Sequence, residues 1–390
     1  MWTRAYFCLF FFELCLQLGT QTSNPIVSNY ALSLGATVVL AGTLASISAF
    51  SGLIMRALSG PLLARLPIKK LLIFFSVLFC MGSFLCTLIQ DLQVLAICRV
   101  MAGVANAGKS TLIIAYAAYI LPEETRGQGV AWIAIYNVIG VALGPIISSF
   151  MGDHFGWRSA FFLSGVFFLL AVASSLLLKS PQVSDDKKKD AGPAEKRSVL
   201  KSFVYIGALP IAFIAVLEGV CYGTMNTLTL TVGEMRGITS ISLYYVAYVT
   251  VSFAARPFSG RFYDRFGFRK VCVPMALFIF GAMIAMAFAQ GPASVLVAGA
   301  LFALGQGCMW PCLQAQCVKG VPPEKYSLSA NTMSLGVDVG CTLGPLLGGV
   351  ILSAAGATAM YLFDAAIACM LLAAIVFYGN LHRLVTNNRS

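Results

Sequence analysis

Six ionisable side chains lie within long apolar stretches of this chain, where a charge needs either a partner or a function. They are Glu13, Arg99, Lys109, Glu218, Asp338 and Asp364. A charge at the centre of a membrane helix costs about 2.5–3.5 kcal/mol on insertion scales. A chain that carries all six either pairs them or uses them to bind and move ions.

The composition is that of a membrane protein. Of the 390 residues, 59% are hydrophobic and only 11% are charged, whereas soluble domains carry about a quarter charged residues. The mean hydropathy is +0.85. Basic loops that stay in the cytoplasm account for the net charge of +11, so we expect a lipid bilayer around the chain and no nucleic-acid partner.

Twelve apolar stretches are long enough to cross about 30 Å of hydrocarbon. They cover residues 5–24, 37–57, 71–89, 93–118, 128–150, 158–178, 202–225, 241–258, 271–289, 292–317, 329–353 and 358–379. We therefore predict an all-α polytopic membrane protein with twelve transmembrane helices. The long polar segment 179–201 is expected to be a solvated linker between an N-terminal bundle, 1–178, and a C-terminal bundle, 202–390.

The distribution of Lys and Arg predicts the orientation. With a cytoplasmic N-terminus, nearly all of the 26 basic residues fall in cytoplasmic loops or at the adjoining helix ends. A shift by one helix would invert this bias. The prediction is a multi-pass protein of the cell (plasma or inner) membrane, monomeric, with both termini and the linker in the cytoplasm.

An internal repeat runs through the chain at an offset of 200 residues. RALSGPLLARLPIKK, residues 56–70, matches RPFSGRFYDRFGFRK, residues 256–270, and GVALGP, residues 140–145, matches GCTLGP, residues 340–345. Several matches at one offset indicate a duplicated unit. The two copies are six-helix units with the same orientation.

These motifs resemble those of the major facilitator superfamily. GRFYDRFGFRK, residues 260–270, is similar to the family's loop signature between the second and third helices of a half. RVMAGVANAG, residues 99–108, resembles its fourth-helix pattern, and GVALGPIISS, residues 140–149, resembles the fifth-helix pattern of its drug:proton antiporters. The resemblance implies two pseudo-symmetric six-helix bundles, a solute site between them and alternating access.

Two departures from the family pattern bear on the mechanism. The first loop signature has Ala64 and Pro67 where Asp and Gly are expected, so only Asp264 remains of the acidic residues that help to latch the halves in this family. The fifth-helix motif ends in Ser148–Ser149 rather than in two glycines, which weakens the similarity to antiporters.

The motif residues are candidates for gating and for contacts between the halves. Glycines allow two helix backbones to approach closely, and a proline frees a carbonyl and kinks its helix. The alternatives are plain helix packing for the glycines and topology alone for the basic residues. The candidates are Arg56, Gly60, Arg65, Gly140, Gly144, Pro145, Arg256, Gly260, Asp264, Arg265, Gly340, Gly344 and Pro345.

The resemblance also implies candidates for proton coupling. The first and seventh helices line the central cavity in this family, which would place Glu13 and Glu218 on it. Desolvation there disfavours the charged form of a carboxylate, as suits a group that takes up and releases a proton. The alternative is a structural carboxylate, bonded to a neighbouring helix or paired with Arg99 or Lys109.

Four further charges complete the set of six inside the apolar stretches. The family assigns its fourth-helix Arg, here Arg99, a part in proton movement; a structural ion pair is the alternative. Asp338 is a candidate for coupling or cation binding, against a buried hydrogen-bonding role. Lys109 could attract an anionic group of the substrate or extend toward the interface. Asp364, on a helix outside the family's cavity, is expected to be structural.

The predicted cavity walls combine aromatic and amide side chains, which suits aromatic or amphipathic organic solutes. The alternative is that part of the aromatic side chains face lipid or the membrane interfaces. The candidate substrate-binding residues are Gln17, Gln21, Asn106, Lys109, Trp132, Tyr136, Asn137, Tyr222, Asn226, Tyr245, Trp310 and Gln314.

The sequence does not predict an enzyme. GVANAGKS, residues 103–110, formally fits a phosphate-binding loop but lies inside an apolar helical stretch. Cys308, Cys312 and Cys317 have no His or carboxylate nearby in the sequence to complete a metal site. We expect no metal, no cofactor and a gradient as the energy source.

The predicted function is proton-coupled export of small organic molecules, amphipathic or drug-like, by a secondary active transporter. Its partners would be the small-molecule substrate, protons and the bilayer. One alternative is a proton-coupled importer of a small solute, such as an organic anion recognised by Arg99 or Lys109. Another is a non-transporting membrane sensor or a lipid-handling protein.

Overall fold

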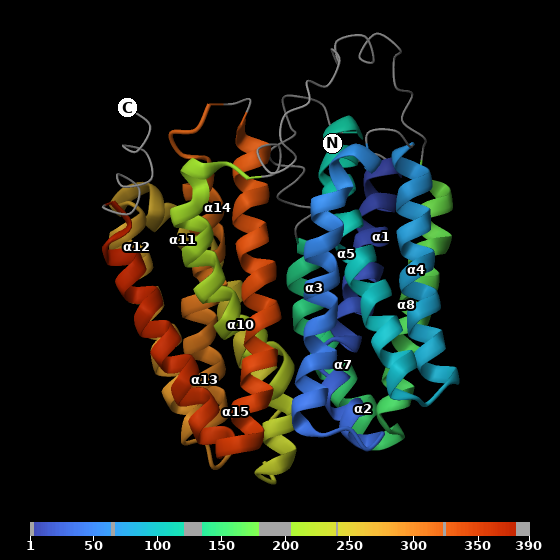
Figure 1. The fold of residues 1–390 in the computed structure, drawn as a ribbon. Helices are drawn as coiled ribbons and strands as arrows, with labels where there is room; N and C mark the ends of the chain where they lie inside the picture. Colours follow the sequence, from blue (N-terminus) through green and yellow to red (C-terminus); the bar gives the residue numbers. More distant parts are fainter. Residues whose placement is uncertain are drawn as a thin grey trace.

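The computed structural model describes residues 4–63, 67–120, 135–178, 204–238, 241–322 and 325–379. Within these ranges the chain is helical and contains no strand. A helix lies at each of the twelve predicted crossings, and Figure 1 shows the helices gathered into two groups that stand side by side. The all-α fold of two six-helix bundles is therefore confirmed.

The first group holds the helices of the N-terminal half. They are α1 (Arg4–Ser23), a short α2 (Val27–Ser33), α3 (Val38–Leu63), α4 (Ile68–Leu88), α5 (Leu92–Ile120), α7 (Ile135–Phe155) and α8 (Trp157–Leu177). Helix α1 packs against α7 and α8, and α5 packs against α3 and α4. These pairings bring polar side chains of α1, α3 and α5 toward the other half.

The second group holds the helices of the C-terminal half. They are α10 (Leu209–Met235), preceded by the 3-10 turn η3 (Ile206–Ala208), then α11 (Leu243–Phe266), α12 (Phe268–Ala287), α13 (Pro292–Phe302), the π-helical segment η4 (Ala303–Gly307), α14 (Cys308–Val318) and α15 (Tyr326–Val376). Helix α10 runs about ten residues beyond the predicted crossing 202–225. Its last turns carry the buried residues Thr227, Thr229 and Thr231. Such a polar stretch is also typical of a loop, which is why the predicted crossing ends too early.

Two crossings meet within α15 at Gly356. Its φ of 81° is not helical, and glycine adopts this left-handed region at little cost because it has no Cβ. Helix α15 therefore supplies both the eleventh and the twelfth predicted crossings, and Figure 1 shows its two arms.

Seven helices in the described ranges are long and apolar enough to cross a membrane by composition, and the last of these, Leu328–Val376, contains both arms of α15. Helices α1 and α5 are not among the seven. Each carries several polar side chains, such as Gln17 and Asn106. That polarity is needed where a helix faces a polar cavity.

The halves are in close contact at the end where α2 lies (Figure 1). A Cβ built on Gly42 of α3 would lie 2.5 Å from the carbonyl oxygen of Pro345 and 3.1 Å from Cα of Gly349, both on α15. The Thr231 hydroxyl of α10 donates to Oδ1 of Asn29 in α2 at 2.5 Å, and both residues are buried. We call this end, with Asn29, Gly42, Thr231 and Pro345, the closed end.

Some residues for which the sequence predicts a role lie outside the described ranges. These are the linker 179–201, Arg65 and Trp132. Gly60, Arg256 and Asn137 belong to described helices, but their side-chain environments are likewise outside the description.

Candidate functional site

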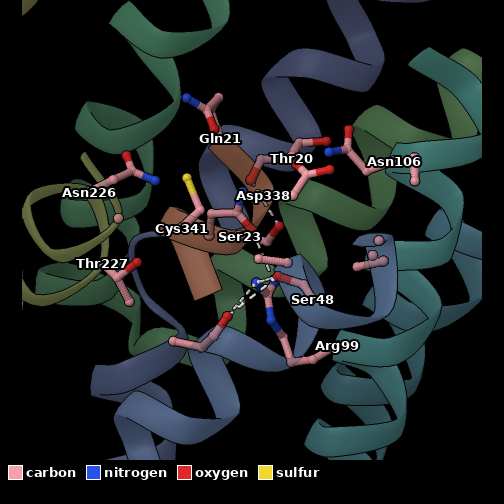
Figure 2. A pocket seen from close by; sticks show the side chains of 18 of the residues that line it. Thr20, Gln21, Ser23, Ser48, Arg99, Asn106, Asn226, Thr227, Asp338 and Cys341 are labelled. Atoms are coloured by element: carbon pink, nitrogen blue, oxygen red, sulfur yellow. Dashed lines mark hydrogen bonds between the residues drawn. The ribbon is translucent and has the colours of Figure 1, made fainter. Parts of the chain in front are cut away.

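A cavity of about 310 Å³ lies between the two halves. Helices α1, α3 and α5 form most of its wall, and α10 and α15 close it from the other half (Figure 2). The polar lining residues are Gln17, Thr20, Gln21, Ser23, Asn24, Ser48, Arg56, Arg99, Asn106, Tyr222, Asn226, Thr227 and Asp338. Hydroxyl, amide and charged groups thus dominate the lining.

The glycines of α7 position the amides of α1. A Cβ on Gly140 would lie 2.3 Å from Cγ of Gln17, and one on Gly144 would lie 2.4 Å from Cβ of Gln21. Only glycine lets α1 and α7 pack this closely. The contact belongs to one half rather than to the boundary between halves, and it holds Gln17 and Gln21 on the cavity wall.

The counterpart glycines of α15 behave in the same way. A Cβ on Gly340 would lie 2.2 Å from the carbonyl oxygen of Val216 in α10, and one on Gly344 would lie 2.4 Å from that of Val220. Both contacts lie within the C-terminal half, as expected for the packing alternative. Pro345, in the same motif, also reaches the other half, because its carbonyl oxygen lies beside Gly42.

Arg99 lies on the cavity wall and is only 5% exposed. Its Nη1 donates to Oδ1 of Asn24 at 3.0 Å, and its Nη2 donates to the Ser48 hydroxyl and, at 3.5 Å, to the carbonyl oxygen of Ala45. Figure 2 shows Arg99 extended toward Ser48. These acceptors are all neutral.

A glycine one turn along α5 makes these bonds possible. A Cβ on Gly103 would lie 2.0 Å from the carbonyl oxygen of Ser48 in α3. Close approach of α5 and α3 at this point brings Arg99 to Ala45 and Ser48.

An ion pair joins the two halves on the cavity wall. Nε of Arg56 in α3 lies 2.5 Å from Oδ2 of Asp338 in α15, and both side chains are about four-fifths buried. Nη1 of Arg56 also donates to the Ser110 hydroxyl of α5 at 3.4 Å. The two charges thus neutralise each other where α3 faces α15.

A second ion pair lies inside the N-terminal half. Nζ of Lys109 is 3.6 Å from Oε2 of Glu13, and the side chains are 5% and 0% exposed. The Tyr136 side chain lies next to Glu13. None of these three residues lines the cavity, so Glu13 is paired and enclosed in this conformation.

Glu218 and Asp364 are buried without an ionic partner among the described residues. Glu218 lies beside Gln306 of η4, which accepts the Tyr248 hydroxyl at 2.5 Å. Asp364 Oδ1 accepts the Thr224 hydroxyl at 3.4 Å. In the described part of the chain, no group of three His, Cys, Asp or Glu side chains could hold a metal ion.

The cavity contains five of the predicted substrate residues, namely Gln17, Gln21, Asn106, Tyr222 and Asn226. Other candidates lie away from it. Tyr245 is buried behind the wall, where its hydroxyl donates to the Asn226 carbonyl at 3.5 Å. Trp310 packs against the core of the C-terminal half, and Gln314 is exposed.

The described loop-signature residues of the second half lie at the surface. Gly260, Asp264 and Arg265 are exposed, and the guanidinium of Arg265 lies 5.2 Å from the ring centre of Phe266. Asp264 belongs to neither ion pair found in the described ranges. Within the described ranges, the ion pair that links the halves is instead Arg56–Asp338.

Several cavity residues were missed in the sequence. Thr20, Ser23, Asn24, Ser48 and Thr227 are common polar residues of membrane helices, and isolated hydroxyls do not stand out. One signal was available, because 20–24 reads TQTSN at the end of a membrane-length helix. Such density of polar side chains is typical of a helix that faces a polar cavity.

A polar, partly charged cavity enclosed between two membrane-embedded helical bundles defines a membrane transport protein. A family model described as Major Facilitator Superfamily matches residues 9–239 and 236–389. The chain belongs to this superfamily. It is a multi-pass membrane transporter of small molecules and not an enzyme.

Known proteins with similar sequences include drug-resistance transporters. The chain is 27% identical to a "Chloramphenicol resistance protein" of Streptomyces lividans over 83% of this chain and 82% of that protein. It is 23% identical to "Multidrug resistance protein MdtG" of Dickeya zeae over 63% of this chain and 62% of that protein. The crystal structure of the nucleoside transporter NupG has the same fold, with a TM-score of 0.76, 14% identity and coverage of 96% of this chain and 98% of that one.

Proposed function

We propose that this transporter exports small organic molecules in exchange for protons, by alternating access to the cavity between its halves. The observation that carries the proposal is the Arg56–Asp338 ion pair, which joins α3 to α15 on the cavity wall. A carboxylate in this place is open to protonation and to contact with a bound solute.

Protonation of Asp338 would break the link between the halves. The neutral carboxyl no longer attracts Arg56, so α3 and α15 can separate at this level. In the ionised state the pair holds them together. The cavity includes both side chains, so a bound solute competes for the same groups, and proton and solute binding become alternatives as antiport requires.

The names of the relatives support export as the direction. Proteins named for chloramphenicol and multidrug resistance cover much of this chain. The expectation of an amphipathic substrate has less support from the cavity, because Tyr245, Trp310 and Gln314 lie away from it. We therefore propose small and polar organic solutes.

Glu13 and Glu218 remain candidate proton sites, but unlike Asp338 they lie away from the cavity. Both are enclosed and neither lines the cavity. A proton could reach Glu13 only after a rearrangement that separates it from Lys109. Asp338, being partly exposed in the cavity, is the more direct coupling residue.

The proposal includes the predicted topology. We place the protein in the plasma or inner membrane as a monomer, with both termini and the linker 179–201 in the cytoplasm. In support, Lys70, Arg269 and Lys270 are exposed, and α4 and α12 begin at the same end of the molecule as α1 (Figure 1). Basic residues gathered at one membrane face mark the cytoplasmic side.

Transport in inverted membrane vesicles tests the proposal, with radiolabelled chloramphenicol and radiolabelled 4-hydroxybenzoate as probes. Wild-type vesicles should accumulate a probe when a proton gradient is imposed and lose it when an uncoupler is added. Asp338→Asn should abolish gradient-driven accumulation but retain exchange of labelled for unlabelled probe, because the neutral amide can neither release a proton nor pair ionically with Arg56.

Asp91→Asn is the matched control, because Asp91 is exposed and its Oδ1 only caps the start of α5 by accepting from the backbone of Gln93 and Val94. It should transport like the wild type. Accumulation that survives the uncoupler would exclude proton coupling. Gradient-driven accumulation that survives in Asp338→Asn would exclude the ion pair as the coupling element.

A further inference from the structure

We infer that the cavity recognises a small organic anion and that Arg99 binds its carboxylate. The inference rests on the proposed transport function, since it names the substrate class of the same cavity. It comes from the charges of the cavity wall and from the bonds of one guanidinium.

The charges of the side chains on the cavity wall do not sum to zero. Arg56 and Asp338 neutralise each other at 2.5 Å. Arg99 is the remaining charge on the described wall, and neither of the ion pairs in the described ranges includes it. The described wall of the cavity therefore carries one net positive charge.

The guanidinium of Arg99 also has donors to spare. Arginine presents five N–H groups, and the bonds of Arg99 to Asn24, Ala45 and Ser48 occupy three. Its Nε is buried with no hydrogen-bond partner in the described part of the chain. A buried charge is costly without a counter-charge. Nε and Nη2 form one edge of the planar fork that matches a carboxylate, and a ligand there would replace the long 3.5 Å bond from Nη2 to Ala45.

Lys109 does not compete for this role. It is equally buried but already faces Glu13 at 3.6 Å, and it lies off the cavity wall. Of the two cations that the sequence offered for an organic anion, only Arg99 combines a place on the wall with a missing counter-charge.

The rest of the cavity suits the same class of ligand. Its volume of about 310 Å³ is at the lower end of the range for small-molecule sites. Thr20, Asn106, Asn226 and Thr227 supply hydroxyl and amide groups elsewhere on the same cavity wall (Figure 2). A small carboxylate with further hydrogen-bonding groups fits this lining, whereas an organic cation would meet the positive charge.

Three ring compounds of nearly equal size test the inference, because they differ in charge. Benzoate is an anion, benzamide is neutral and benzamidine is a cation; 4-hydroxybenzoate and 4-hydroxybenzamide add a hydroxyl. Binding to the purified full-length protein in lipid nanodiscs is measured by calorimetry and by the shift in melting temperature, without any gradient. We expect each carboxylate to bind at least tenfold more tightly than its amide, and benzamidine to bind most weakly.

Two substitutions assign the effect to Arg99. Arg99→Gln should remove the preference for carboxylate over amide, and Arg99→Lys, which keeps the charge but not the fork, should keep part of it. The melting temperatures without ligand show whether each variant is folded, and if the Gln variant is unfolded the Lys variant carries the test. Equal binding of acid and amide by the wild type would overturn the inference, as would an unchanged preference in a folded Arg99 variant.

This result is independent of the proposed coupling. If the carboxylate preference holds but vesicles show no gradient-driven transport of either probe, the anion site stands and proton-coupled export fails. If transport is proton-driven but acid and amide bind equally, the transporter stands and Arg99 serves another purpose, such as pairing with a carboxylate of this chain in another conformation.

Discussion

At the scale of single residues, the membrane-embedded charges are handled in three ways. Glu13 and Lys109 pair within one half, and Arg56 and Asp338 pair across the two halves. Arg99 has only neutral partners. The first arrangement suits a structural role, the second suits a link that can break and re-form, and the third suits a binding site.

The Glu13–Lys109 pair makes a prediction about stability. Glu13→Gln leaves Lys109 buried without a counter-charge, and breaking a buried pair typically costs about 3–5 kcal/mol. The melting temperature of the purified variant should therefore fall strongly. Glu13→Gln/Lys109→Met removes both charges and should recover most of the loss. A single variant as stable as the wild type would show that the pair contributes little.

The same variants separate structure from coupling. Vesicles that contain the double variant should still carry out gradient-driven transport if Asp338 is the coupling residue. A stable double variant without gradient-driven transport would instead assign the coupling proton to Glu13. The readout is the accumulation assay described for Asp338.

At the scale of elements, close glycine contacts decide which side chains reach the cavity. Gly140 and Gly144 hold α7 against α1 and thereby place Gln17 and Gln21, and Gly103 holds α5 against α3. Each contact is between helices of one half. The motif glycines therefore shape the site through the close packing of helices within each half.

Gly103→Ala tests this role. The added Cβ would lie 2.0 Å from a backbone oxygen of α3, which cannot move without the helix, so α5 must shift. Overpacking of this kind typically costs about 1–3 kcal/mol, and the shift should displace Arg99 from Ser48. We expect a lower melting temperature and weaker binding of benzoate, both measured on the purified protein.

Gly281→Ala in α12 is the matched control, because its Cβ would meet only a Leu301 methyl group at an ordinary 3.5 Å. It should leave benzoate binding unchanged. If Gly103→Ala binds benzoate as the wild type does, the α3–α5 contact does not position Arg99.

At the scale of the whole molecule, two kinds of contact join the halves. The closed end uses backbone packing of Gly42 against α15 and the Asn29–Thr231 hydrogen bond. The Arg56–Asp338 pair lies 14 residues along α3 from Gly42, about 21 Å at 1.5 Å per residue. Contacts so far apart can open in turn, as alternating access requires.

Cross-linking of the closed end tests this motion. A short bifunctional thiol reagent should join Asn29→Cys to Thr231→Cys and stop transport, since the closed end can then no longer open. If the reagent attaches to both cysteines through disulfide bonds, reduction removes the cross-link and should restore transport. The chain has 12 native cysteines, so the treated wild type and both single variants are the controls. Full transport by a cross-linked protein would show that this end does not need to open.

The number and order of the helices could be predicted from the sequence because a bilayer demands long apolar segments whose backbone bonds are satisfied internally. The offset of 200 residues likewise predicted the two halves. The site was predicted in part. Gln17 and Asn106 stood out as amides in apolar helices, whereas Ser48 and Thr227 did not, because a hydroxyl is common on membrane helices whichever way it faces.

The sequence by itself determined that this chain crosses a membrane repeatedly as a duplicated helical unit and that it carries charges inside. Only the tertiary structure decided their partners. Glu13 pairs with Lys109, Arg56 pairs with Asp338, and Arg99 is left on the cavity wall. Partners distant in the chain depend on how each helix is rotated and how closely it packs, and these are set by contacts such as Gly103 on Ser48 and Gly42 on Pro345.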